Sequence, residues 1–85
     1  RAPLADTTLL ALWAWREDEF LRRTEGSAIR RIGYRRWQRN LAVGLGNALR
    51  AAADPAIERA LHDRLAGADD MVAEHIEWAL QQRTA

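Results

Sequence analysis

The sequence has 85 residues, of which 48% are hydrophobic and 29% charged, with a net charge of +1, a composition typical of one folded domain. It contains no cysteine, which excludes disulfides, thiolate metal sites, cysteine-ligated iron–sulfur clusters and cysteine nucleophiles. No apolar run approaches the roughly 20 residues of a membrane span and no targeting signal opens the chain, so we expect a cytoplasmic protein. Because the chain begins at Arg1 rather than methionine, we expect a fragment of a longer protein.

Glycine and proline divide the chain into predicted helices, and the scarcity of β-branched residues argues against a sheet. Asp6 is the expected N-cap of a first helix that runs to about Ala14. The acidic residues at 17–19 suit the N-terminus of a second helix, which we expect Gly26 to end. Residues 27–32 are expected to form a connecting loop.

Three further helices are predicted at residues 33–52, 54–67 and 69–83. Asp54 caps the helix at residues 54–67, with Pro55 at its first helical position. Asp69 or Asp70 caps the helix at residues 69–83. Each helix carries one apolar stripe with a four-residue spacing. The stripes are Trp37, Leu41, Leu45 and Leu49; Ile57, Leu61 and Leu65; and Val72, Ile76 and Leu80.

A faint internal repeat relates residues 39–45 to residues 74–80, at an offset of 35 residues. Periods of about 30–45 residues with paired helices are typical of α-solenoids. We therefore predict an all-α fold of about five helices in a single domain spanning the chain. In it, residues 33–52 and 54–83 form a HEAT-like repeat pair behind leading helices at residues 1–26. A generic helical bundle is the alternative.

The charged residues are segregated along the chain. Residues 21–53 carry eight of the thirteen arginines and one acid, a net charge of +7, whereas the flanks at residues 1–20 and 54–85 carry net charges of −2 and −4. A basic block of this kind either binds an anionic partner or pairs with the acidic flanks of its own chain.

The candidate anion-binding residues lie between residues 30 and 40, which we call the basic segment. They are Arg30, Arg31, Arg35, Arg36, Arg39 and Asn40. Arginine suits phosphate because its planar guanidinium group binds two oxygens at once. Arg35 and Arg39 share one line of the third helix. The same line continues through Ala42 and Gly46, whose small size leaves room either for a phosphate backbone or for a packed helix.

Several large or polar side chains have two interpretations. Trp37 and Trp78 lie in apolar stripes and are expected in the core rather than stacked on RNA bases. Trp13 and Trp15 either stack on bases or pack against a domain outside this chain. Asn40 either bonds backbone in a neighbouring turn or contacts RNA.

The sequence contains no recognisable catalytic or metal-binding arrangement. His62 and His75 are the only imidazoles, and neither has the spacing of a metal-ligand pair. Ser27 is the only serine, and no nucleophile–base set accompanies it. We therefore expect neither a metal site nor catalytic residues in this chain.

Four short motifs resemble the C-terminal region of the epoxyqueuosine reductases. SAIRRIG at residues 27–33 and WQRNLAVGLGN at residues 37–47 carry most of the resemblance. EHIEWAL at residues 74–80 resembles the end of that family's HEAT-like repeat, and WREDEF at residues 15–20 resembles its acidic helix start. Arg16 departs from the pattern, because a Thr or Ser cap is usual at that position.

The resemblance implies a substrate-binding part of an oxidoreductase that completes queuosine synthesis in tRNA. The whole enzyme would use cobalamin and two 4Fe–4S clusters, held upstream of this fragment, which itself would hold no cofactor. The expected partners are the tRNA anticodon stem–loop, bound through the basic segment, and the upstream catalytic domain, in a monomer without membrane contact. The alternative is a structural helical-repeat domain that mediates domain or protein contacts without nucleic acid.

Overall fold

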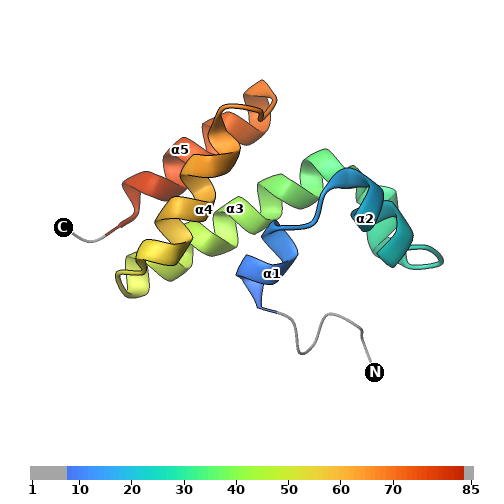
Figure 1. The fold of residues 1–85 in the computed structure, drawn as a ribbon, viewed down its shortest axis with the longest axis horizontal. Coiled ribbons are helices and arrows are strands. Elements are labelled where there is room, and N and C mark those ends of the chain that lie inside the picture. Colours follow the sequence, from blue (N-terminus) through green and yellow to red (C-terminus); the bar gives the residue numbers. More distant parts are fainter. Residues whose placement is uncertain (1–7, 84–85) are drawn as a thin grey trace.

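The computed structural model describes residues 8–83 and contains only helices over that range (Figure 1). The elements are α1 (Leu9–Trp13), α2 (Glu17–Arg23), the 3-10 helix η1 (Ala28–Ile32), α3 (Gly33–Ala51), α4 (Pro55–Leu65) and α5 (Asp70–Gln81). No strand occurs within residues 8–83, which confirms the all-α prediction. None of these helices is both long enough and apolar enough to cross a bilayer.

The starts of the helices follow from capping side chains. The Asp54 carboxylate accepts a hydrogen bond from the backbone N–H of Ala56 at 3.0 Å, with Pro55 in the first turn of α4. Asp69 caps α5 and is one of the two caps predicted for it. The expected cap Asp6 lies outside the described residues, and Thr8 caps α1 instead.

Two predictions about the α2–α3 connection were wrong. Helix α2 ends at Arg23, and Gly26 lies beyond it in a turn with φ of 75°. Residues 27–32 are not a loop, because Ala28–Ile32 forms the 3-10 helix η1. The Ser27 hydroxyl starts η1 by accepting a hydrogen bond from the Ile29 N–H at 3.2 Å. Helices α4 and α5 also end two residues earlier than predicted, at Leu65 and Gln81.

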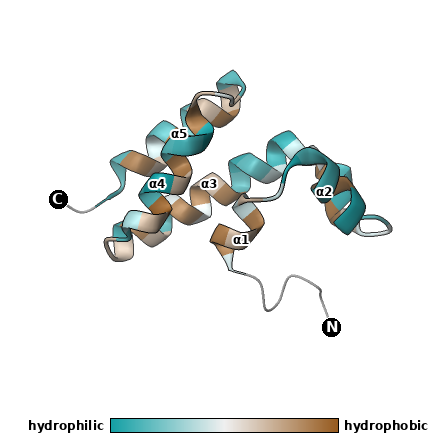
Figure 2. Ribbon diagram, viewed as in Figure 1, coloured by the Kyte–Doolittle hydropathy of each residue, from teal (hydrophilic) through white to brown (hydrophobic). Residues whose placement is uncertain are grey.

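Helix α3 is the centre of the molecule and packs against every other helical element (Figure 1). Its predicted apolar stripe is buried, and so are all residues of the α4 and α5 stripes except the half-buried Leu65. Helix α5 runs alongside α3 from Arg35, which pairs with Asp69, to Gly46, which meets Trp78 and Ala79. Helix α2 lies at the N-terminal end of α3. Figure 2 shows the corresponding change along α3, from hydrophilic near α2 to more hydrophobic near α4.

Helices α3 and α5 approach each other closely at Gly46. A Cβ atom at Gly46 would lie 2.7 Å from Cζ3 of Trp78 and 2.9 Å from Cα of Ala79. Ala42, one turn earlier, is fully buried. The small residues on this line of α3 therefore accommodate a packed helix, and the alternative, that they leave room for a phosphate backbone, was wrong.

The aromatic residues form a second part of the core, near the N-terminal end of α3. Trp15 stacks on Trp37 with ring centroids 5.5 Å apart, and the Phe20 ring lies 5.2 Å from that of Trp37. Trp13 is 2% exposed, and its Nε1 donates a hydrogen bond to the carbonyl oxygen of Ala60 at 3.0 Å. Trp13 and Trp15 thus pack within this chain, so they are neither base-stacking platforms nor contacts for another domain. Trp78 is half-buried against the same core.

We predict that Gly46→Ala destabilises the protein, because its methyl group would collide with the backbone of α5. The expected loss is about 1–3 kcal/mol in the free energy of unfolding, measured by denaturant titration. Gly44→Ala is the matched control, since its Cβ would meet only the flexible side chain of Leu9, at 3.3 Å. The control should be neutral or stabilising by up to about 1 kcal/mol, through helix propensity. Equal effects at the two positions would contradict the packing account.

Candidate nucleic-acid interface

The basic segment spans η1 and the N-terminal part of α3. Five of its six candidate side chains are exposed, and that of Arg39 is half-buried. The exposed ones are Arg30, Arg31, Arg35, Arg36 and Asn40. The apolar stripe of α3 begins at Trp37, and Tyr34, Gln38 and Arg39 near it are half-buried.

Arg35 and Arg39 have different bonding partners. The Arg35 guanidinium forms an ion pair with Asp69, with 2.7 Å between Nε and Oδ2. Arg39 instead donates two hydrogen bonds to Oδ1 of its neighbour Asn40, from Nε at 3.3 Å and from Nη2 at 3.1 Å. The Asn40 amide therefore bonds a side chain of the basic segment and not the backbone of a neighbouring turn.

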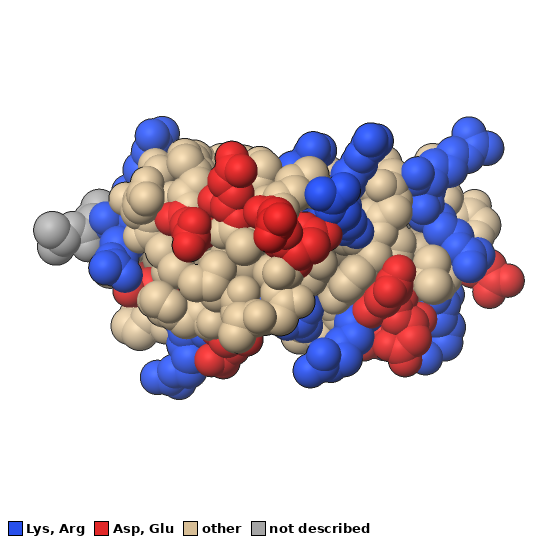
Figure 3. Space-filling model, turned by 90° about the horizontal axis from the view of Figure 1, so that it is seen from above, with Lys and Arg blue, Asp and Glu red and all other residues tan. Residues whose placement is uncertain are grey.

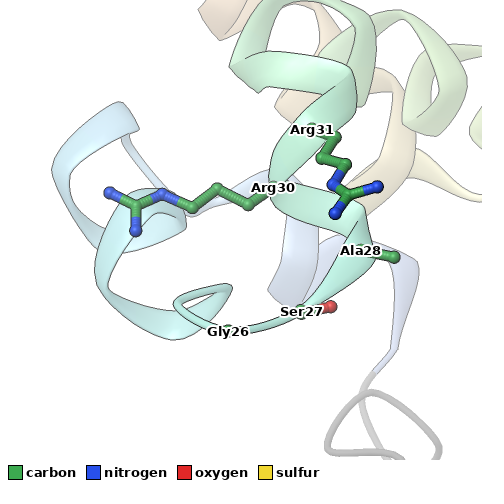
Figure 4. Close-up of a pocket in the computed structure, with 5 residues that line it drawn as sticks. All are labelled: Gly26, Ser27, Ala28, Arg30 and Arg31. Atoms are coloured by element: carbon green, nitrogen blue, oxygen red, sulfur yellow. The ribbon is translucent and has the colours of Figure 1, made fainter.

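Arg30 and Arg31 flank a shallow depression before α3. The depression has a volume of about 640 Å³ and is lined by Gly26, Ser27, Ala28, Arg30 and Arg31. In the close-up view the Arg30 and Arg31 side chains extend to opposite sides of η1 (Figure 4). Arg30 and Arg31 therefore directly precede the α3 arginines in the sequence, but their guanidinium groups point in different directions.

Acidic residues lie on α5 and at the start of α2, two elements next to this basic end. Figure 3 shows one group of acidic side chains near the middle of the molecule and a second group among the basic side chains toward the α2 end. Helix α5 carries Asp70, Glu74 and Glu77 as exposed acids. The acidic surface of α5 meets the basic segment at the Arg35–Asp69 ion pair.

A hydrogen-bond network that the sequence did not reveal holds the start of α3 in place. The Tyr34 hydroxyl donates to the carbonyl oxygen of Trp15 at 2.7 Å and accepts from Nη1 of Arg64 at 3.1 Å. Nη2 of Arg64 donates to the carbonyl oxygen of Ala14 at 3.0 Å, and its guanidinium group lies 5.9 Å from the Trp13 ring centroid. The partners are 19 to 50 residues apart, so no local pattern links them.

The described residues offer no metal or cluster site. No group of three or more His, Cys, Asp or Glu residues in positions 8–83 is placed to hold a metal ion. Nδ1 of His75 lies 2.8 Å from the carbonyl oxygen of Met71, within its own helix. Because the chain contains no cysteine, its residues do not fit a 4Fe–4S cluster.

The fold and the interface define a small all-helical module with an arginine-rich end. Over its whole length the chain is 56% identical to a protein named epoxyqueuosine reductase from Shewanella oneidensis, across 87 residues that make up 21% of that protein. It is 51% identical to the epoxyqueuosine reductases of Pseudomonas aeruginosa and Escherichia coli K12, with 96% and 98% of this chain and 22% and 21% of those proteins covered.

The chain is therefore homologous to one segment of the epoxyqueuosine reductases. It spans about a fifth of the length of the curated relatives that it matches. No family model matches the chain, and no solved structure matches it significantly.

We predict that Tyr34→Phe destabilises the protein by about 1–2 kcal/mol, because it removes a hydroxyl that both donates and accepts within a half-buried network. Thermal and denaturant unfolding of the variant measure this loss. The Arg64→Ala variant should lose as much or more, and the double variant should lose less than the sum of the two single changes. Additive effects would show that the hydroxyl and the guanidinium group do not act together.

Proposed function

We propose that this chain is the tRNA-binding, HEAT-like C-terminal module of an epoxyqueuosine reductase. In this proposal it holds the anticodon stem–loop so that an upstream catalytic domain, carrying cobalamin and two 4Fe–4S clusters, reduces epoxyqueuosine to queuosine. The catalytic chemistry is assigned to that upstream domain because this chain has no thiolate ligands. The module's own contribution is to bind and orient the substrate.

The homology is the observation that carries the proposal. Identities of 51–56% over essentially the whole chain support a shared role with the corresponding segment of those reductases. The exposed arginines of the basic segment add a physical reason for RNA as the ligand. Guanidinium groups bind phosphate oxygens in pairs, and a run of them along one helix end suits a phosphate backbone.

The proposed contacts fall on the α3 arginines together with those of η1. Arg36 and Arg39 lie on α3, and Arg31 lies on η1 immediately before it. Charged contacts of this type are made to the RNA phosphate backbone and not to the bases, so binding should be weak and should depend little on the RNA sequence. With about three to five phosphates neutralised, log K should fall by about 2 to 4.5 units per tenfold rise in salt.

The alternative function is a structural helical module that makes domain or protein contacts without nucleic acid. The Arg35–Asp69 ion pair favours it, because part of the basic charge is neutralised within the chain. Arg39 does not follow this pattern, since its described hydrogen bonds go to Asn40 and not to an acid of α5. Arg39 therefore distinguishes the two functions better than Arg35 does.

We predict that Arg39→Ala weakens binding of a fluorescently labelled anticodon stem–loop RNA by about 1–2 kcal/mol and lowers the salt slope by about one contact. The melting temperature should stay nearly unchanged, because this side chain is half-buried and bonds only an exposed neighbour. Arg59→Ala, on α4, is the matched control and should leave RNA affinity almost unaltered. A lowered melting temperature with an unaltered RNA affinity would favour the structural module and end the phosphate-binding proposal.

A further inference from the structure

The ion pair between Arg35 and Asp69 places a carboxylate inside the proposed phosphate-binding surface. Arg35 belongs to the basic segment on α3, and Asp69 stands at the start of α5. The two residues are 34 positions apart in the sequence, and their charged atoms lie 2.7 Å from each other. A carboxylate in this position occupies the guanidinium group that a phosphate would otherwise bind.

We propose that Asp69 competes with RNA phosphate for Arg35 and so lowers the affinity of the basic segment for polyanions. This inference rests on the proposed function, because it assigns a regulating residue to the same site. A phosphate group that reaches Arg35 has to displace the Asp69 carboxylate. Polyanions that contact only the other arginines leave the ion pair intact and gain less binding energy.

The exposure of the pair makes such an exchange feasible. The Arg35 side chain is 62% exposed and that of Asp69 is 44% exposed, so water and ligand reach both groups. Exposed ion pairs contribute little net stability, because both charges are well solvated when apart. A phosphate that accepts two hydrogen bonds from one guanidinium group is therefore able to replace the carboxylate.

The two carboxylate oxygens of Asp69 have different partners. Oδ1 accepts a hydrogen bond from the Val72 N–H at 2.9 Å and caps α5, whereas Oδ2 faces Arg35. Displacement of the ion pair therefore leaves the cap in place, and α5 stays folded while RNA binds. The same division makes a clean variant possible, since Asn and Ser side chains also cap helices but carry no charge.

Titration of the chain with anticodon stem–loop RNA at low salt tests the proposal, with Asp69→Asn as the main variant. We expect Asp69→Asn to tighten binding by about two- to fivefold, the strength of an exposed ion pair. Asp70→Asn is the matched control: it removes the same charge one residue away, at a position that forms no ion pair among the described residues. The control should tighten RNA binding by less than about twofold, because it changes only the long-range electrostatic attraction between the chain and the RNA.

A second pair of variants isolates Arg35. In an Arg35→Ala background, Asp69→Asn should have no larger effect than Asp70→Asn, because the group for which Asp69 competes is gone. Asp69→Ser repeats the test with a different cap, and thermal melting of each variant verifies that α5 is intact.

The outcomes separate this inference from the function on which it rests. If the unaltered chain binds no RNA, both are overturned. If it binds RNA and Asp69→Asn behaves like Asp70→Asn, only the competition is overturned. Weaker RNA binding by Asp69→Asn would also overturn it, since Asp69 would then position Arg35 for phosphate instead of competing with it.

Discussion

The close packing of α3 against α5 at Gly46 is the constraint on which the rest of the structure depends. A backbone approach of this kind is possible only where α3 lacks a side chain, because a Cβ atom would lie within 3.0 Å of both Trp78 and Ala79. The contact sets α5 alongside α3, and α4 packs against both helices. Short interhelical distances allow the Leu and Ile stripes of three helices to share one core.

The same constraint determines where charge is left accessible. The α5 cap Asp69 reaches α3 at Arg35, and the first turns of α3 expose Arg35 and Arg36 beside the buried Trp37. The aromatic cluster and the Tyr34–Arg64 network hold this end of α3 against α2, α4 and the α1–α2 connection. The basic segment is thus an exposed surface on a rigid support, which limits the entropy lost when a ligand binds it.

Much of this fold was predictable from local signals in the sequence. The stripes at Leu41, Leu61 and Ile76 and the caps at Asp54 and Asp69 identified the long helices, since periodicity and capping are properties of neighbouring residues. Helix η1 was missed because a short 3-10 helix has no apolar period. The candidate arginines were identifiable by composition, but the pairing of Arg35 with Asp69 was not, because it depends on how α5 crosses α3.

The most direct test of the central claim is an amide NMR titration of the chain with anticodon stem–loop RNA. The account predicts that chemical-shift changes concentrate in residues 28–40, with a smaller change at Asp69, while the buried part of α3 and the outer faces of α4 and α5 stay unaltered. Salt should reverse the changes, because the contacts are to phosphate. Shifts centred on residues 55–83, or no shifts at any RNA concentration, would contradict the claim that the arginine-rich end of α3 is the anion-binding surface.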